Sequence, residues 1–193
     1  MLEREIKLLF DSPTEARAAV IAAGASRVSG RRLQDDQLFD TDDRRLMQLR
    51  STLRVRRENG ITTLTFKGPV QPGRMKVREE HETTVADGDA LLRTLEGVGL
   101  HPWFRYQKFR EEYAAPGVTI AIDETPVGTF IEIEGSEEGI LATARALGRS
   151  EADFILDSYR GLFVARRDGC GMTGADMVFP GHVALDGHAQ QSS

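Results

Sequence analysis

Charged and apolar side chains alternate along the first segment of this chain, residues 2–10. Glu3, Glu5 and Lys7 are separated by single residues, and Ile6 lies between two of them. Successive side chains of a β-strand point to opposite faces, so the three charged residues share one face and mainly apolar residues take the other. Such a strand fits either a sheet edge with solvated charges or the wall of a barrel with a polar interior.

Similar alternation recurs downstream, and this recurrence favours the barrel. We predict strands over residues 2–10, 31–41, 53–57, 61–67, 75–85, 103–113, 118–123 and 128–135, with a hairpin turn at Asn59-Gly60. Acids share strand faces at Glu3/Glu5, Glu80/Glu82, Asp123 and Glu132/Glu134, and bases do so at Lys7, Arg54/Arg56, Lys67, Lys76/Arg78 and Lys108/Arg110. Unpaired buried charge costs several kcal/mol per ion, so this interior requires water and a highly charged guest. The pattern predicts a wide closed barrel with polar residues inside and apolar residues outside.

Four further segments have the apolar spacing of helices, which we expect to cover the apolar outside of the barrel. The predicted ranges are 12–24, 87–100, 136–148 and 150–166. Ser12 is suited to cap the first helix, with Pro13 at its first position. The run Ser150-Glu151-Ala152-Asp153 has the form of a capping box at the start of the last helix. Residues 42–45 are expected to form a turn.

The composition is that of a globular protein with one domain and a short tail. The chain has 193 residues, 40% hydrophobic and 28% charged, with a formal net charge of −5. This charge gives no support for nucleic-acid or membrane binding, and no apolar run is long enough to span a bilayer. A charged N-terminus and a single cysteine, Cys170, fit a cytoplasmic location. We expect a domain over residues 1–167 and a Gly-rich, loosely ordered tail over 168–193.

The charged strand faces indicate the chemistry of the guest. Arg54 and Arg56 are suited to forked hydrogen bonds with phosphate oxygens, and Lys7, Lys67 and Lys108 to point-charge contacts. Carboxylates do not bind phosphate directly at neutral pH and need a divalent cation between the two. A metal-bound polyphosphate satisfies both sets of groups.

An ordered series of short motifs resembles one known family over roughly residues 1 to 166. The series is Glu3-x-Glu5-x-Lys7, Phe39-Asp40-Thr41, Leu53-Arg54-Val55-Arg56, Thr65-Phe66-Lys67-Gly68-Pro69, Arg78-x-Glu80-x-Glu82, Lys108-x-Arg110, Ile122-Asp123-Glu124, Gly128-x-Phe130-x-Glu132-x-Glu134 and Ser158-Tyr159. One ExExK motif alone is a weak signal, whereas the whole series resembles the CYTH superfamily, also called the triphosphate tunnel metalloenzymes. Ser51 departs from a glycine that is frequent in relatives, and we expect no functional consequence from this difference.

The resemblance implies an α+β, mainly β fold, in which an eight-stranded antiparallel barrel encloses a tunnel for a triphosphate and Mg²⁺ or Mn²⁺. It implies that the metal-binding acids are Glu3, Glu5, Asp123, Glu132 and Glu134. It implies that the triphosphate-binding bases are Lys7, Arg54, Arg56, Lys67, Arg78, Lys108 and Arg110. The candidate catalytic residues are Glu5, Lys7 and Glu132. Glu80 and Glu82 match motif positions, where structural pairing with tunnel bases is an alternative role, and we expect a homodimer by analogy.

The expected function is metal-dependent hydrolysis of a triphosphate-bearing small molecule, either inorganic tripolyphosphate or a nucleoside or thiamine triphosphate. A class IV adenylate cyclase, which converts ATP into cyclic AMP and pyrophosphate, would use the same tunnel and metals. The motif residues do not separate these two activities, and the sequence does not reveal a place for adenine at the tunnel mouth. A non-catalytic polyphosphate or nucleotide binding module is the alternative from another class, and the filled acid positions speak against it.

Overall fold

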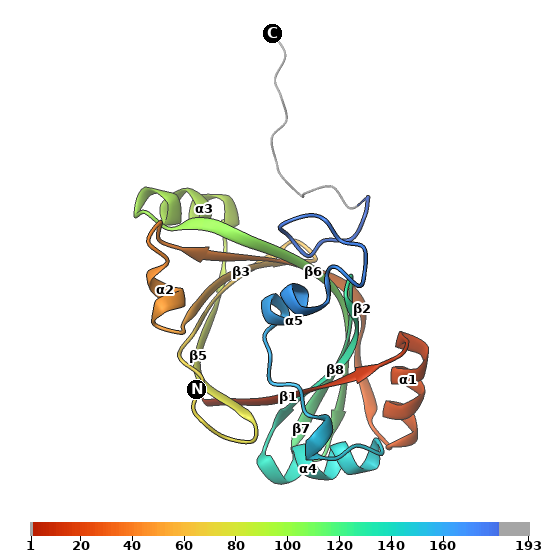
Figure 1. Ribbon diagram of the computed structural model, residues 1–193. Coiled ribbons are helices and arrows are strands. Elements are labelled where there is room, and N and C mark those ends of the chain that lie inside the picture. The colour runs from red at the N-terminus through yellow and green to blue at the C-terminus, as the bar shows by residue number, and fades with distance from the viewer. Residues whose placement is uncertain (1, 182–193) are drawn as a thin grey trace.

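Eight antiparallel strands close into a barrel at the centre of the molecule (Figure 1). The computed structural model describes residues 2–181. The strands are β1 (Leu2–Phe10), β2 (Ser26–Asp40), β3 (Thr52–Glu58), β4 (Ile61–Lys67), β5 (Lys76–Val85), β6 (His101–Ala115), β7 (Val118–Thr125) and β8 (Gly128–Gly135). Around the barrel they follow the order β1-β5-β4-β3-β2-β6-β7-β8. The predicted fold class is confirmed.

Of the α-helices in residues 2–181, all but the last cover the apolar outer face of the barrel. The helices are α1 (Pro13–Ala22), α2 (Arg45–Gln48), α3 (Gly88–Gly97), α4 (Glu137–Ala146) and α5 (Tyr159–Arg166), with a 3₁₀ helix, η1 (Glu151–Asp153), before the last. Apolar side chains of α1 and α4 form a buried cluster with Ile6, Ile120 and Ile133 of the barrel. Leu95 of α3 packs near Val55 in a smaller cluster. The prediction that apolar residues point outward and charged residues inward is therefore confirmed for these strands.

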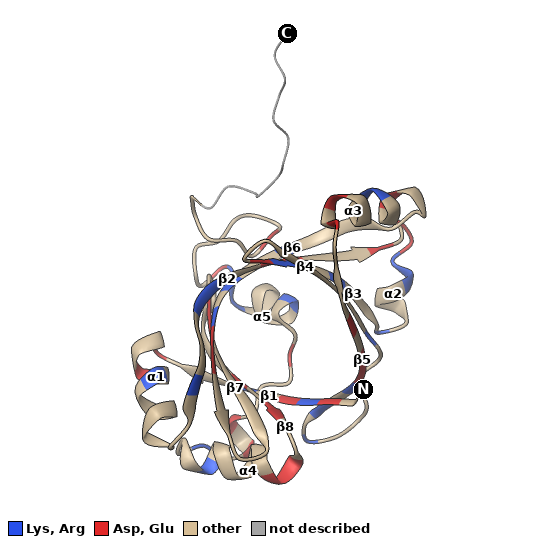
Figure 2. Ribbon diagram, turned by 180° about the vertical axis from the view of Figure 1, so that it is seen from behind, with Lys and Arg blue, Asp and Glu red and all other residues tan. Residues whose placement is uncertain are grey.

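Helix α5 is placed differently, since it lies across the barrel opening in both views (Figures 1 and 2). Its side chains Tyr159 and Phe163 belong to an apolar cluster with Phe104 of β6 and Phe130 of β8. The rings of Phe104 and Phe163 have their centroids 5.7 Å apart. Aromatic packing thus fills the part of the interior next to α5, while charged residues line the rest.

The segment 150–166 is not the single helix that we predicted. After η1 the chain is extended, and Ile155 exchanges two backbone hydrogen bonds with Lys7, of 3.0 and 2.9 Å. The pairing of β1 with β5 ends at Glu5, so the backbone groups of Lys7 on that side need another partner. Residue 155 supplies it, and α5 begins only after its N-cap, Ser158.

The turn predicted at 42–45 is followed by a short helix, α2, that the sequence did not reveal. The carboxylate of Asp40 accepts hydrogen bonds from the backbone N–H groups of Leu46, at 2.8 Å, and Met47, at 3.0 Å. These bonds satisfy N–H groups in the first turn of α2. A single buried acid at the end of β2 therefore fixes this helix beside the barrel.

The Gly-rich segment after Asp168, expected to be loosely ordered, contacts the barrel over part of its length. Met177 is fully buried and forms backbone hydrogen bonds of 3.0 and 2.8 Å with Arg105 and Gln107 of β6. Residues 182–193 of the predicted tail lie outside the described residues. Within residues 2–181, no helix combines the length and apolar character needed to cross a membrane.

Candidate active site

The barrel encloses a cavity of about 1090 Å³ whose wall is densely charged. The lysines and arginines that line it are Lys7, Arg50, Arg54, Arg56, Lys67, Lys76, Arg78, Lys108, Arg110 and Arg160. The lining acids are Glu3, Glu5, Glu80, Glu82, Glu112, Glu132, Glu134 and Asp157. All of the bases that we predicted to bind triphosphate lie on this wall, and so do all of the predicted metal-binding acids except Asp123.

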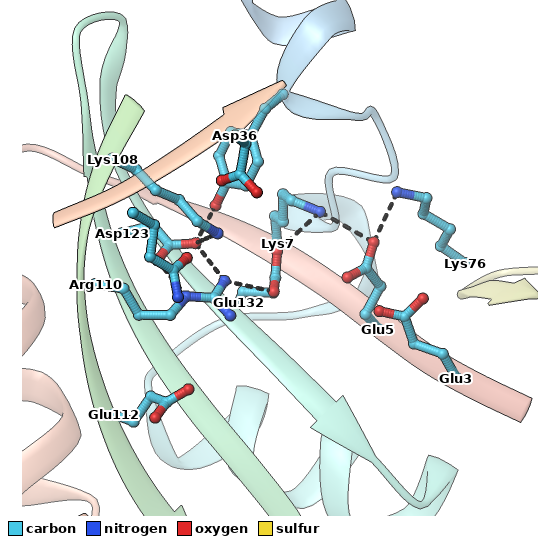
Figure 3. Close-up of polar contacts among 12 residues, drawn as sticks. Glu3, Glu5, Lys7, Asp36, Lys76, Lys108, Arg110, Glu112, Asp123 and Glu132 are labelled. Atoms are coloured by element: carbon cyan, nitrogen blue, oxygen red, sulfur yellow. Dashed lines mark hydrogen bonds and ion pairs between the residues drawn. The ribbon is translucent and has the colours of Figure 1, made fainter. Parts of the chain in front are cut away.

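Strand β1 places Glu5 and Lys7 at the centre of one ion-pair network (Figure 3). The Lys7 ammonium donates to Glu5 at 3.1 Å and lies 3.2 Å from a carboxylate oxygen of Glu132. Lys76 donates to the same Glu5 oxygen at 2.7 Å. Burial alone would raise the pKa of Glu5, but the positive charges of Lys7 and Lys76 outweigh it and lower that pKa. Glu5 is therefore ionised throughout the neutral range.

Glu3 and the two acids of β5 are paired with bases on the neighbouring wall. Glu3 accepts from Lys67 at 2.7 Å and from the guanidinium of Arg78 at 3.1 Å. Lys67 also lies 2.9 Å from Glu80, and Arg54 lies 3.3 Å from Glu82. Both motif acids of β5 are thus salt-bridged to cavity bases.

Glu134 has a different environment, because it stands next to other acids. It lies opposite Glu5 in the β1–β8 register, and no ion pair joins it to a lysine or arginine among residues 2–181. The surrounding protein partly desolvates this carboxyl and adds the negative charges of Glu3 and Glu132, which together raise the pKa of Glu134 to about 7. The cavity therefore has one corner, formed by β1 and β8, where negative charge is in excess.

On the opposite wall, a buried acid holds two arginines of β3 in place. The Asp36 carboxylate, which has no exposed surface, accepts from the Arg56 guanidinium at 2.8 and 3.3 Å and lies 3.4 Å from that of Arg54. Arg54 also donates to Thr65 at 3.0 Å. Our sequence analysis missed Asp36. Its stretch, Gln34-Asp35-Asp36-Gln37, is uniformly polar and shows no alternation that would have indicated an inward face.

Asp123 performs a similar task for the two bases of β6. It accepts from Lys108 at 2.8 Å, from Arg110 at 2.7 and 2.6 Å, and from the hydroxyl of Tyr159. Arg110 also donates to Glu132 at 2.7 Å, which links this group to β8. Burial and the nearby charge of Arg110 lower the pKa of Lys108 to about 8. Asp123 is fully buried behind its partners and does not reach the cavity surface.

The carboxylates of β1 and β8 are chemically suited to bind a divalent cation, although most of them pair with lysines and arginines in the structure. Within the part of the chain that the structure describes, no three His, Cys, Asp or Glu side chains stand together as a metal cluster. The lining bases are nevertheless matched in number by the lining acids together with Asp36 and Asp123. A polyphosphate entering alone would therefore add uncompensated negative charge, which a divalent cation on carboxylate oxygens would offset.

The sequence matches the CYTH domain over residues 1–159. This chain belongs to the CYTH domain family. The match covers all eight strands, and it confirms the resemblance that the motifs carried. A relative in Methanocaldococcus jannaschii, named "Putative adenylate cyclase", is 28% identical over 170 residues, which cover 82% of this chain and 97% of the relative.

Solved structures of other proteins share this CYTH fold. A protein of Pyrococcus horikoshii is 28% identical, with a TM-score of 0.70 over 86% of this chain and 99% of that protein. A "putative adenylate cyclase" of Vibrio parahaemolyticus gives a TM-score of 0.75 at 21% identity, over 85% and 98% of the two chains. An adenylyl cyclase homologue of Hippeastrum, described as revealing a dominant triphosphatase activity, gives 0.62 at 21% identity, over 86% and 96%. The likenesses at 21% identity establish the shared fold.

Proposed function

We propose that this CYTH protein is a divalent-metal-dependent hydrolase of a triphosphate-bearing small molecule. The observation that carries the proposal is the convergence of lysines and arginines from β1, β3, β4, β5 and β6 on one cavity that also has a carboxylate-rich corner. Bases alone would suit any polyanion. The acids of that corner, Glu3, Glu5, Glu132 and Glu134, are suited to hold a cation beside the anion.

Ligand binding would exchange one set of ion pairs for another. Lys7, Lys67 and Lys76 are each within 3.2 Å of a carboxylate oxygen. Phosphate oxygens can replace these carboxylates, since both groups accept charge-assisted hydrogen bonds from ammonium and guanidinium groups. The released Glu3 and Glu5 would then be free to hold a cation. This exchange explains why the interior carries many charges that are balanced among its own acids and bases.

The residues that would hold Mg²⁺ or Mn²⁺ are Glu3, Glu5, Glu132 and Glu134, whose strands β1 and β8 are neighbours. Asp123 would join them only by exchanging its bonds with Lys108, Arg110 and Tyr159. When bound, such a cation neutralises phosphate charge and lowers the pKa of a coordinated water molecule.

The bases would orient the triphosphate and neutralise the charge that develops on the leaving group. Lys7 remains protonated, because the negative charges of Glu5 and Glu132 outweigh burial and raise its pKa. Arg54 and Arg56 would clamp phosphate oxygens from a position already fixed by their buried acid. Phosphoryl transfer requires little covalent chemistry from a protein, so positioning and electrostatic stabilisation by these groups suffice.

A class IV adenylate cyclase is the second candidate. The relative whose name includes adenylate cyclase is 28% identical and is covered over 97% of its length, which favours this activity specifically. The same phosphate-binding wall would serve it, with the 3′-hydroxyl of ATP attacking in place of water.

A product assay separates the candidates. The purified protein receives inorganic tripolyphosphate or ATP, first with Mg²⁺ and then with Mn²⁺, and orthophosphate, pyrophosphate and cyclic AMP are resolved. We expect phosphate release without cyclic AMP. Cyclic AMP formed together with pyrophosphate would identify a cyclase, and tight binding without turnover would indicate a non-catalytic binding module.

A further inference from the structure

We infer that the cavity opening beside α2, β6 and α5 binds a flat heteroaromatic ring of the substrate, with Trp103 as the stacking surface. The inference rests on the proposed function and narrows its substrate class. It selects a triphosphate ester that carries such a ring, as a nucleoside triphosphate does, over inorganic tripolyphosphate.

An irregularity in β6 turns Trp103 toward the cavity. In the β2–β6 register Leu38 lies opposite Phe104 but Phe39 lies opposite Pro102, so Trp103 is an extra residue without a cross-strand partner. Bulges of this kind re-aim a side chain. Phe104 is buried in the cluster below α5, whereas Trp103 is only partly buried and lines the cavity. One side of the indole is thus anchored in the protein and another part faces the opening.

Two apolar side chains line the cavity together with Trp103, alongside the guanidinium groups of Arg50 and Arg160. Met47 of α2 lines the same cavity with 51% of its surface exposed, and Leu38 of β2 lines it as well. The backbone of Met47 is fixed by its 3.0 Å hydrogen bond to Asp40. Methionine is a soft, polarizable residue that suits contact with an aromatic ring. A phosphate chain has no group to place against these three side chains.

Two guanidinium groups already lie over the Trp103 ring. Those of Arg44 and Arg160 are 4.8 and 5.7 Å from the ring centroid, and Arg160 also lines the cavity. Each of these contacts uses the negative π face of the indole. Nucleobases bind proteins through the same combination of aromatic stacking and arginine contact. A planar ligand that enters the opening would displace one of these guanidinium groups from the Trp103 ring and stack in its place.

The side chains around Trp103 adjoin the phosphate-binding wall directly. Leu38 is the register partner of Arg54 on β3, so it lies beside an arginine assigned to phosphate. The cavity volume of about 1090 Å³ slightly exceeds the upper end of the range of roughly 300–1,000 Å³ that is typical of small-molecule sites. A triphosphate held by Arg54 leaves room for its organic group at Trp103.

Tryptophan fluorescence tests the inference in the unmodified protein, because Trp103 is the sole tryptophan of the chain. The probes are a non-hydrolysable ATP analogue, thiamine triphosphate and inorganic tripolyphosphate, each with Mg²⁺. We expect the ATP analogue to quench the emission, and tripolyphosphate to change it far less while displacing the analogue. The thiamine triphosphate arm shows whether the ring that stacks belongs to a nucleobase or to thiamine.

Two variants provide a second readout by calorimetry. Trp103→Leu should weaken binding of the ATP analogue about 5- to 150-fold, the range for loss of one base–aromatic stack, and leave tripolyphosphate affinity within about twofold. Met47→Ser, at a half-exposed position where folding is not at risk, should weaken the analogue by a smaller factor. Unchanged affinity, or equal losses for both ligands, would overturn the inference.

The same titrations distinguish failure of the inference from failure of the proposed function. If the unmodified protein binds tripolyphosphate but neither ring-bearing ligand, or binds the ring-bearing ligands without any change in emission, the ring site is refuted and the triphosphate cavity stands. If it binds none of the three ligands, both are refuted.

Discussion

Two walls face each other across the cavity, and they are held in different ways. The basic wall consists of Arg54, Arg56, Lys108 and Arg110, and the acidic wall of Glu3, Glu5, Glu132 and Glu134. Behind the basic wall stand two acids without exposed surface. Asp36 holds the guanidinium group of Arg56 by paired hydrogen bonds, and Asp123 holds that of Arg110 in the same way. The acidic wall has no such support behind it. Glu3, Glu5 and Glu132 pair with lysines and arginines that line the cavity, and among residues 2–181 no ion pair joins Glu134 to a base.

The difference shows which part of the site is complete before a ligand arrives. The basic wall is pre-organised, and pre-organised donors bind an anion with little cost of ordering. The carboxylates of the acidic wall are neutralised by lysines and arginines that the proposed ligand would also bind. Under the proposed function, binding of an anion would release acids of the other wall for a cation. The following changes are designed to break this coupling.

The largest effect is expected when the support of the basic wall is removed. Asp36→Asn would leave two guanidinium groups without their buried counter-charge, which should lower the free energy of unfolding by about 3 kcal/mol. Tripolyphosphate should restore much of this loss, because it supplies the missing negative charge. Denaturant unfolding with and without tripolyphosphate measures both. Asp42→Asn, at an almost fully exposed carboxylate, is the control.

The acidic wall is tested through turnover. Glu5→Gln should reduce metal-dependent turnover about 100-fold, since Glu5 is assigned to the cation. It also removes the carboxylate that pairs with the buried Lys7 and Lys76, so the free energy of unfolding should fall as well, and turnover is compared under conditions where both proteins are folded. Glu132→Gln should behave alike. Steady-state kinetics with Mg²⁺ provide the measurement. Glu79→Gln, which changes an exposed carboxylate of β5, is the matched control. Full activity in Glu5→Gln would remove it from the metal set.

Truncation on the basic wall should show up in affinity. Arg56→Ala removes charge-assisted hydrogen bonds and should weaken tripolyphosphate binding about 10- to 100-fold, measured by calorimetry. The neighbouring Arg57 lies on the other face of β3, where it pairs with Asp89, so Arg57→Ala should leave affinity nearly unchanged. Equal effects of the two substitutions would place Arg56 outside the binding surface.

The smallest effect is a pH dependence confined to the acidic wall. Below about pH 7 the Glu134 carboxyl is protonated and must lose its proton to bind a cation, so Mg²⁺ affinity should rise up to about tenfold from pH 6 to 7.5. Above about pH 8, where Glu134 is ionised, this contribution levels off. Glu5 and Glu132, whose pKa values are lowered, are ionised throughout and contribute none of it. Calorimetry with Glu134→Gln should give a flat profile, and a persistent slope would assign it to another group.

The fold and most cavity residues were predictable because their sequence signals are local. On β1, β3 and β8, charged residues recur at every second position over residues 3–7, 54–56 and 132–134, so the inward face can be identified from the chain alone. Asp36 was missed because every residue near it is polar. The role of Trp103 depends on an extra residue in β6, which shifts the alternation by one position and leaves no mark in a single sequence.

The prediction of a single helix over residues 150–166 was wrong for a different reason. The capping motif and the apolar spacing of this segment both favour a helix, and these signals are correct for η1 and α5 taken separately. What breaks the helix is the unpaired backbone of Lys7, almost 150 residues earlier in the chain. A long-range requirement of this kind cannot be read from local periodicity.

The position of β1 between β5 and β8 has a consequence for how the chain folds during synthesis. Its partners are residues 76–79 and 129–134, so the first strand made cannot complete its pairing until most of the chain exists. Contacts so distant in sequence make closure slow, and an unpaired strand invites aggregation. Until the partner strands have been synthesised, Glu3, Glu5 and Lys7 remain hydrated. Charged residues on a free strand oppose edge-to-edge association. The residues assigned to the ligand therefore also protect the nascent chain before there is a cavity to enclose them.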